Sequence, residues 1–205
     1  MKKIAGLALV VAFLVGQPGM LLAEDTKTFT LSASVPKATS VAITASKVVG
    51  TTFTTMTGTA LSFDPMTFQT TSKIWLPAHY FAVDIAPSNG GSAGTNVTVN
   101  YTEGANPNGT GGHGLGWKST ATFMKVVGTT ETALTIHGPK KMLKDVIGEN
   151  ILPGEVAGGY LRVYLGIVTK DKAAAYQDPS TSEPFTNADA PGVYDGTITF
   201  TATVA

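Results

Sequence analysis

Apolar and polar residues alternate with a period of two along much of this 205-residue chain. Alternation over four to eight residues, with many β-branched and aromatic side chains, is typical of strands that bury one face and expose the other. The segments with this pattern are residues 28–35, 41–45, 80–85, 96–101, 160–167 and 194–204. The sequence therefore predicts an all-β fold, with two sheets packed face to face as a β-sandwich.

Helical signals are weak and short. Residues 139–147 place apolar side chains at helical spacing after a proline and before Gly148, which predicts a short helix, and residues 172–177 predict one further turn. Nine glycines between Ala86 and Trp117 predict two loops around one short strand. With no internal repeat and no shift in composition, the mature chain is expected to form one domain.

The composition excludes several classes of protein. The chain has 14 Lys+Arg and 14 Asp+Glu, so it lacks the basic face that a nucleic-acid-binding protein needs. It has no cysteine, which excludes disulfides, thiolate nucleophiles and cysteine-ligated metal sites. A hydrophobic fraction of 43% is too high for a disordered chain. We therefore expect a folded domain that forms its core without covalent cross-links.

Residues 1–23 have the pattern of a secretory signal peptide. Lys2 and Lys3 precede an apolar run from Ile4 to Val15, and Leu21-Leu22-Ala23 offers a cleavage site before Glu24. The apolar run is shorter than the roughly 20 residues that span a bilayer as a helix. We therefore expect an exported protein with no membrane span in its mature chain.

Motifs for catalysis, metal binding or cofactor binding are not apparent in the sequence. It contains no Gly-x-Ser-x-Gly, no His-Glu-x-x-His and no Walker loop. Residues 112–116 are glycine-rich, but they neither lead directly into Lys-Ser/Thr nor open a predicted helix. His79, His113 and His137 share no ligand spacing, and His137 is expected to be exposed on the polar side of its segment. We expect a protein that is not an enzyme and needs no cofactor or metal.

The two ends of the mature chain carry the most informative pattern. Thr28-Phe-Thr-Leu-Ser-Ala-Ser-Val-Pro36 is an alternating segment between a polar leader and a proline. Gly192-Val-Tyr-Asp-Gly-Thr-Ile-Thr-Phe-Thr-Ala-Thr-Val204 is an alternating segment at the other end. They resemble the donor strand and the final strand of chaperone–usher fimbrial subunits, particularly the cysteine-free pilins of the alternate, colonisation-factor type.

The resemblance implies an incomplete immunoglobulin-like sandwich that a strand from a neighbouring subunit completes. Residues 24–36 would be the donor-strand extension and residues 37–205 the pilin domain. The donor side chains would be Phe29, Leu31, Ala33 and Val35. The final strand, with Tyr194, Ile198, Phe200, Ala202 and Val204, would line the acceptor groove and pair first with a periplasmic chaperone.

The same resemblance implies the partners and the location of the protein. Identical subunits would form a homopolymer after an outer-membrane usher exchanges the chaperone for the donor strand. The subunit would pass through the periplasm and end in a cell-surface fimbria that serves adhesion or biofilm formation. A host or surface glycan is the expected type of ligand for such a fimbria.

A different function remains open from the sequence. Alternation alone favours residues 28–35 as the first strand of their own domain, and the protein could then be a secreted, monomeric β-sandwich that binds carbohydrate or matrix. Its candidate stacking residues would be Trp75, Tyr80, Tyr101 and Trp117. Trp75 lies between Ile74 and Leu76, which favours a place in the core, whereas the place of Trp117 is undecided.

Overall fold

The computed structural model describes residues 40–87, 95–105, 109–135, 137–169 and 183–204. These residues form antiparallel β-sheets with a few short helical turns, so the prediction of an all-β fold is confirmed. The predicted signal peptide, the donor strand with Phe29, Leu31, Ala33 and Val35, and the turn at 172–177 lie outside the described residues. No helix among the described residues is long and apolar enough to cross a membrane.

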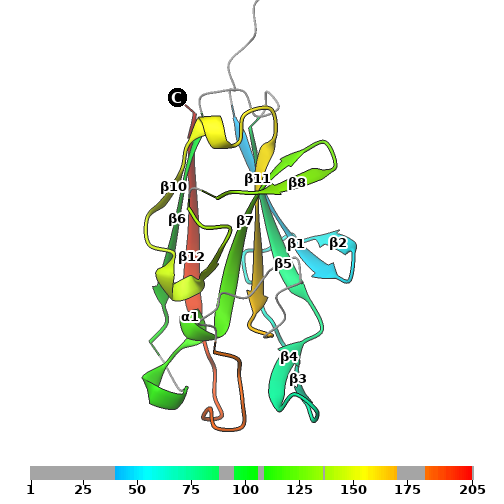
Figure 1. Ribbon diagram of the computed structural model, residues 1–205, viewed down its shortest axis with the longest axis vertical. Helices are drawn as coiled ribbons and strands as arrows, with labels where there is room; N and C mark the ends of the chain where they lie inside the picture. Colours follow the sequence, from blue (N-terminus) through cyan, green and yellow to red (C-terminus); the bar gives the residue numbers. More distant parts are fainter. Residues whose placement is uncertain (1–39, 88–94, 106–108, 136, 170–182, 205) are drawn as a thin grey trace, which may run out of the picture. The chain divides into compact units, whose positions relative to one another are not determined.

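The larger sheet has seven strands in the order β2-β1-β5-β11-β7-β8, with β9 paired to β7 (Figure 1). Its strands are β1 (Val41–Val49), β2 (Thr52–Thr55), β5 (Tyr80–Pro87), β7 (Ser119–Val127), β8 (Thr130–Ala133), β9 (Lys140–Met142) and β11 (Tyr160–Ile167). The strands β5 and β11 lie in the middle of the sheet and bury side chains on both faces. Their sequences are accordingly richer in apolar residues than those of the edge strands.

A second sheet has three strands in the order β10-β6-β12, and a separate hairpin pairs β3 with β4. These strands are β3 (Met66–Gln69), β4 (Ile74–Pro77), β6 (Thr95–Glu103), β10 (Glu149–Ile151) and β12 (Gly196–Val204). Short turns of helix connect several strands: η1 (Thr110–Gly112), α1 (Leu115–Lys118), η2 (Leu143–Asp145) and η3 (Pro153–Glu155). The strand β6 is nine residues long, so it is not the short strand that the flanking glycines predicted.

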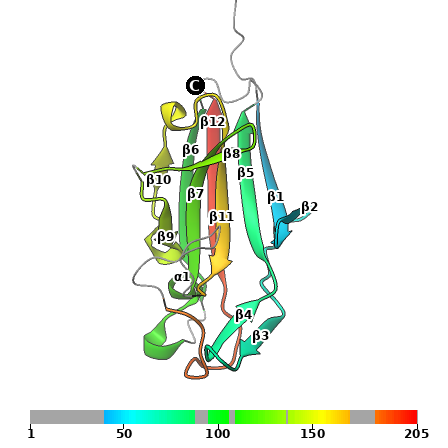
Figure 2. The same ribbon diagram turned by 45° about the vertical axis from the view of Figure 1, so that its right-hand side comes forward.

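The three-stranded sheet faces the seven-stranded sheet across one hydrophobic core (Figures 1 and 2). Phe81, Phe123 and Leu161 enter this core from the larger sheet and are 0–1% exposed. Val97 and Val99 enter it from β6 and are equally buried. The odd-numbered residues of β5, β6 and β11 thus face inward, as their alternation predicted.

The predicted helix at 139–147 is wrong. This segment forms β9 followed by the single turn η2. The carbonyl of Pro139 accepts the backbone N–H of Phe123 at 2.8 Å, and Met142 lies opposite Thr120 in the register of β7. Hydrogen bonds to a neighbouring strand have therefore replaced those within a helix. The apolar side chains of Met142 and Val146 are buried nonetheless, which explains why their spacing resembled a helix.

Two further segments differ from the predictions. The final strand begins at Gly196, so Tyr194 precedes it; the Tyr194 ring packs edge-on against Phe185 with centroids 4.8 Å apart. Its hydroxyl donates to the carbonyl of Ala190 at 2.8 Å. The helix α1 opens within the glycine-rich segment, where no helix was predicted. The contacts of Tyr194 thus lie within the loop that leads into β12.

Candidate functional site

The last strand, β12, lies at the edge of its sheet. It pairs with β6 along all of its nine residues, from Gly196 opposite Glu103 to Val204 opposite Thr95, and no described strand pairs with its other side. Proteins commonly protect exposed edges with charged residues or proline, and β12 contains neither. Its open side can therefore accept a further strand.

The inward-facing side chains of β12 are incompletely covered. Ile198, Phe200 and Ala202 pack against the core, yet each keeps part of its surface exposed. Their neighbours Val97 and Val99 on β6 face the same core and are only 1% and 0% exposed. Because the β6 and β12 side chains lie on the same face of one sheet, the difference in exposure shows that this face is buried along β6 and incompletely buried along β12.

The facing edge of the larger sheet is exposed in the same way. Val41 and Ala45 of β1 pack against the core, and Ile43 lies between them on the same face of the sheet. Ile43 is 48% exposed, whereas Ile85, directly opposite it on β5, is 1% exposed. The strand β2 pairs only with the second half of β1, from Ser46 onward. No described strand therefore pairs with the outer side of the first half of β1.

A further stretch of partly covered apolar residues follows β2. The backbone N–H of Met56 donates to the carbonyl of Ala45 at 2.9 Å, which holds this stretch against β1. Phe63 packs edge-on against Phe81 with ring centroids 5.1 Å apart. We use the name apolar strip for the incompletely buried apolar residues along β1, β12 and the stretch after β2: Val41, Ile43, Ala45, Met56, Leu61, Phe63, Ile198, Phe200 and Ala202.

A pocket of about 720 Å³ lies where β12 begins, and it shares Leu61 and Phe63 with the apolar strip. Trp75 contributes to its lining, and the indole N–H of Trp75 donates to Oδ1 of Asn187 at 3.1 Å. Trp75 is only half-buried, so the prediction that it belongs to the core is wrong. The pocket has no lysine, arginine or histidine among its described lining residues, which include Asp64, Asp189 and Asp195.

A buried ion pair holds the loop that forms one wall of this pocket. Nζ of Lys118 lies 2.9 Å from Oδ1 of Asp189, and both side chains are 4% exposed. Asp189 also accepts the backbone N–H groups of Thr110 at 3.1 Å and Thr186 at 2.7 Å. Burial opposes ionisation of Asp189, but the contact with Lys118 and the two backbone hydrogen bonds together outweigh burial and lower the pKa of Asp189. The pair therefore links α1 to the loop that leads into β12.

Trp117 and His113 belong to the same loop region. Their rings stack with centroids 3.8 Å apart and an interplanar angle of 3°, and Nδ1 of His113 lies 2.7 Å from Oε2 of Glu183. Nζ of Lys144 lies 4.4 Å from the centroid of the Trp117 ring. The place of Trp117, undecided from the sequence, is therefore in a local packing cluster on α1.

The other two histidines also have structural partners. His137 is 20% exposed, with Nε2 3.1 Å from Oε2 of Glu155, so the prediction that it is exposed is wrong. His79 is buried, and its Nε2 lies 2.9 Å from the carbonyl oxygen of Ser62. Across the described ranges, no group of three or more His, Asp or Glu side chains is placed to hold a metal ion.

The structure brings together only some of the residues that the sequence pattern singled out. Ile198, Phe200 and Ala202 form one inward row on β12, whereas Tyr194 lines the pocket instead. Val204 ends the strand, and its side chain lies outside the described part. The sequence pattern did not predict the partly exposed residues of β1 as the counterpart of this row, although it marked 41–45 as a strand.

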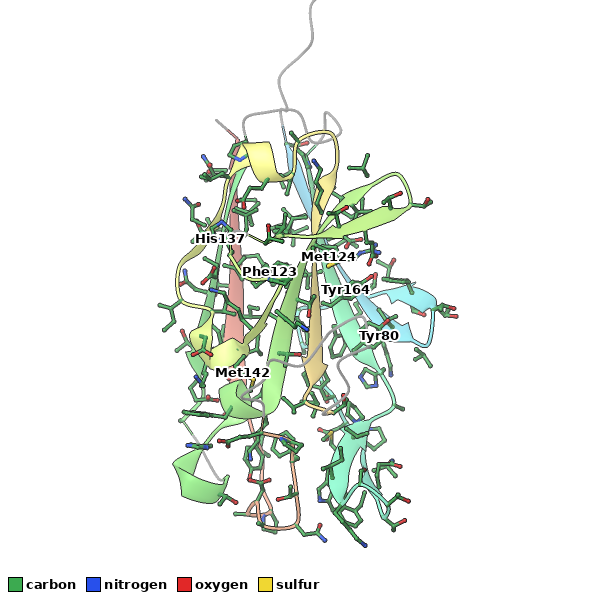
Figure 3. All side chains as sticks on the ribbon, in the orientation of Figure 1. Tyr80, Phe123, Met124, His137, Met142 and Tyr164 are labelled. Atoms are coloured by element: carbon green, nitrogen blue, oxygen red, sulfur yellow. The ribbon has the colours of Figure 1, made fainter. Side chains whose placement is uncertain are left out.

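The four aromatic residues considered for carbohydrate stacking are dispersed. Trp75 lines the pocket and Trp117 belongs to α1. Tyr101 faces the core from β6 and donates its hydroxyl to Oε1 of Glu103 at 2.8 Å. Tyr80 packs on the opposite face of the larger sheet, where Figure 3 shows it with Met124 and Tyr164. These four rings therefore form no common platform for a sugar.

No known protein family matches this chain, and comparisons with curated proteins and with solved structures likewise give no match. An unpaired strand edge beside partly exposed apolar side chains can bind an extended peptide by β-augmentation, with backbone hydrogen bonds and alternate side chains buried. The nine residues of β12 offer an edge of about 30 Å for such a peptide.

Proposed function

We propose that this protein is a structural subunit of an extracellular fimbria that polymerises by donor-strand exchange. Its two facing sheets form an incomplete immunoglobulin-like sandwich, and the missing strand binds along β12. The observation that carries the proposal is the exposure of Ile43 and Phe200, which face the core from two sheet edges that no described strand joins.

Residues 28–35 of a neighbouring copy supply the missing strand. The period of two places Phe29, Leu31, Ala33 and Val35 on one face, which would turn toward the apolar strip. Eight residues span about 26 Å and so cover most of β12. Burying a Phe, Leu or Val side chain contributes about 1.5–3 kcal/mol, and each backbone hydrogen bond adds about 1 kcal/mol net. Because the contact is head to tail, it propagates into a filament.

The open edge needs cover before assembly. Unpaired strand edges and exposed apolar surface favour aggregation. By the resemblance to chaperone–usher pilins, a periplasmic chaperone strand pairs first with β12, and an outer-membrane usher exchanges it for the donor strand. The protein would then act without catalysis or a cofactor, as a cell-surface fimbria in adhesion or biofilm formation. The dispersal of Trp75, Tyr80, Tyr101 and Trp117 gives no support to the alternative of a monomeric carbohydrate-binding protein.

Electrophoresis of material sheared from the cell surface tests the proposal. Samples in SDS should give a ladder of multimers without boiling and one band after boiling, because strand exchange is non-covalent and a chain without cysteine forms no disulfides. Deletion of residues 24–36 should abolish the ladder. A single monomer band from the wild-type protein in both lanes would refute polymerisation.

A matched pair of substitutions on β1 separates assembly from folding. Ile43→Asp places a charge in the apolar strip at a side chain that is already 48% exposed, so the domain should fold while the ladder is lost. Ala42→Asp places the same charge on the opposite face of the same strand, opposite Ala86, and should retain the ladder. Circular dichroism of both variants checks folding. An intact ladder from folded Ile43→Asp protein would contradict the proposed acceptor site.

A further inference from the structure

We infer that the pocket at the Gly196 end of β12 receives the segment that follows the donor strand of the neighbouring copy, with Lys37 of that copy facing Asp64 and Asp195. This inference rests on the proposed function. Asp64 and Asp195 both line the pocket, and neither forms an ion pair with any described residue. The pocket is therefore an apolar cavity with uncompensated negative charge.

The direction of the donor strand decides which of its ends reaches the pocket. All nine strand pairings in the described residues are antiparallel. Antiparallel pairing is also slightly more stable per residue than parallel pairing. A donor strand antiparallel to β12 ends beside Gly196, where β12 begins. The residues after Val35 consequently arrive at the pocket.

The sequence after Val35 fits this place. Pro36 has no backbone N–H and ends the ladder there. Lys37 is two residues beyond Val35, so in an extended chain it would lie on the same face as Phe29 to Val35. A lysine can lay its aliphatic stem on apolar surface while its ammonium group stays at a polar rim. Phe63 and Tyr194 offer that surface, and the two carboxylates offer the rim.

With Val35 beside Gly196 of the receiving copy, the short connection after the donor strand also brings β1 of the donating copy close to the pocket. Only residues 36–40 join the donor strand to β1 of the same copy, which begins at Val41. Five residues span at most about 17 Å. Lys118 of the receiving copy is bound to Asp189, and the described lining of the pocket contains no lysine, arginine or histidine that could neutralise Asp64 and Asp195. The charge of Asp64 and Asp195 is thus left for the incoming lysine.

Peptide binding to the full mature chain carrying Leu31→Asp, which stops its own donor strand from filling a neighbour's site, tests the inference. The probe is a fluorescently labelled peptide of residues 26–38, measured by anisotropy at low salt and at 1 M salt. Lys37→Ala in the peptide should weaken binding about two- to fivefold at low salt, as expected for a partly exposed ion pair. The difference should disappear at 1 M salt, where the Debye length is about 3 Å. Lys27→Ala is the matched control and should bind like the wild-type peptide.

A double-mutant cycle assigns the effect to the two carboxylates. The chain with Asp64→Asn and Asp195→Asn should bind the wild-type peptide as weakly as the wild-type chain binds the Lys37→Ala peptide, and combining the changes should cause no further loss. If the wild-type peptide binds but neither lysine matters, the inference is wrong and the proposed function stands. If only Lys27 matters, the donor is parallel and the inference is equally wrong. If the wild-type peptide does not bind, both proposals are overturned.

Discussion

The ion pair between Lys118 and Asp189 should be a main determinant of stability near the start of β12. The two side chains are 4% exposed and their charged atoms lie 2.9 Å apart. Lys118→Met keeps most of the length of the side chain and removes its charge. Asp189 would then be a buried carboxylate whose remaining described hydrogen bonds come from Thr110 and Thr186.

Breaking one partner of a buried ion pair destabilises proteins by about 3–5 kcal/mol. Because backbone N–H groups of Thr110 and Thr186 still stabilise the carboxylate, we expect the lower end of that range. In a domain of 150–250 residues, each kcal/mol lowers Tm by about 2–4 °C, so Lys118→Met should lower it by roughly 6–12 °C. Circular dichroism measures the shift, and fluorescence of Trp117 reports on the adjacent loop.

Two further variants distinguish burial of the pair from a general effect of losing a lysine. Lys144→Met breaks a more exposed pair with Asp145 together with the contact over the Trp117 ring, and should cost at most about 2 kcal/mol. The double variant with Lys118→Met and Asp189→Asn should be more stable than Lys118→Met alone, because it leaves no unpaired buried charge. A loss below about 1 kcal/mol for Lys118→Met would refute the view that this pair is desolvated.

Three other contacts give testable predictions. The pKa of Asp189 is lowered on folding, so its ionised form stabilises the folded protein fully above the ordinary pKa of 3.8, and this stabilisation is lost as pH falls through the folded pKa. Asp189→Asn should therefore make the free energy of unfolding, measured with urea, depend less on pH in acid. Burial and the hydrogen bond to Glu103 raise the pKa of Tyr101, so its stabilisation is present below the ordinary value of 10.0 and is lost as pH rises through the folded value; Tyr101→Phe should reduce the alkaline loss seen by circular dichroism. Arg162 binds both carboxylate oxygens of Asp84 at 2.7 Å, and Arg162→Lys should cost about 1–3 kcal/mol in urea unfolding because lysine cannot form the paired contact.

Alternation in the sequence was sufficient to predict most long strands. The strands β1, β5, β6, β11 and β12 all lie within or around the segments that alternate, because period two is a local property of an extended chain. The same pattern placed Ile198 and Phe200 on the inward face. It could not predict that Ile43 is half exposed, because burial depends on whether another strand lies above it.

Other features depend on residues that are distant in sequence. Residues 139–147 have apolar spacing that fits a helix, but backbone hydrogen bonds to β7 draw their first part into a sheet. Lys118 and Asp189 have no local signal that predicts their pairing. Trp75 is flanked by apolar residues, yet it lines a pocket because the loop that contains Asn187 approaches it. Such contacts follow from the topology, which a local pattern does not specify.

The geometry of β1 and β12 bears on whether residues 28–35 complete their own domain or a neighbour's. Figures 1 and 2 show the start of β1 and the end of β12 at the same end of the sheets. Residues 36–40 connect Val35 to Val41 and reach at most about 17 Å. If residues 28–35 paired with β12 of their own chain, Val35 would therefore have to lie near Val204. The segment would then run parallel to β12. Ending beside Gly196, as an antiparallel strand must, would require a connection of about 30 Å. A neighbouring copy has no such restriction, so the preference for antiparallel pairing favours exchange between chains over closure within one.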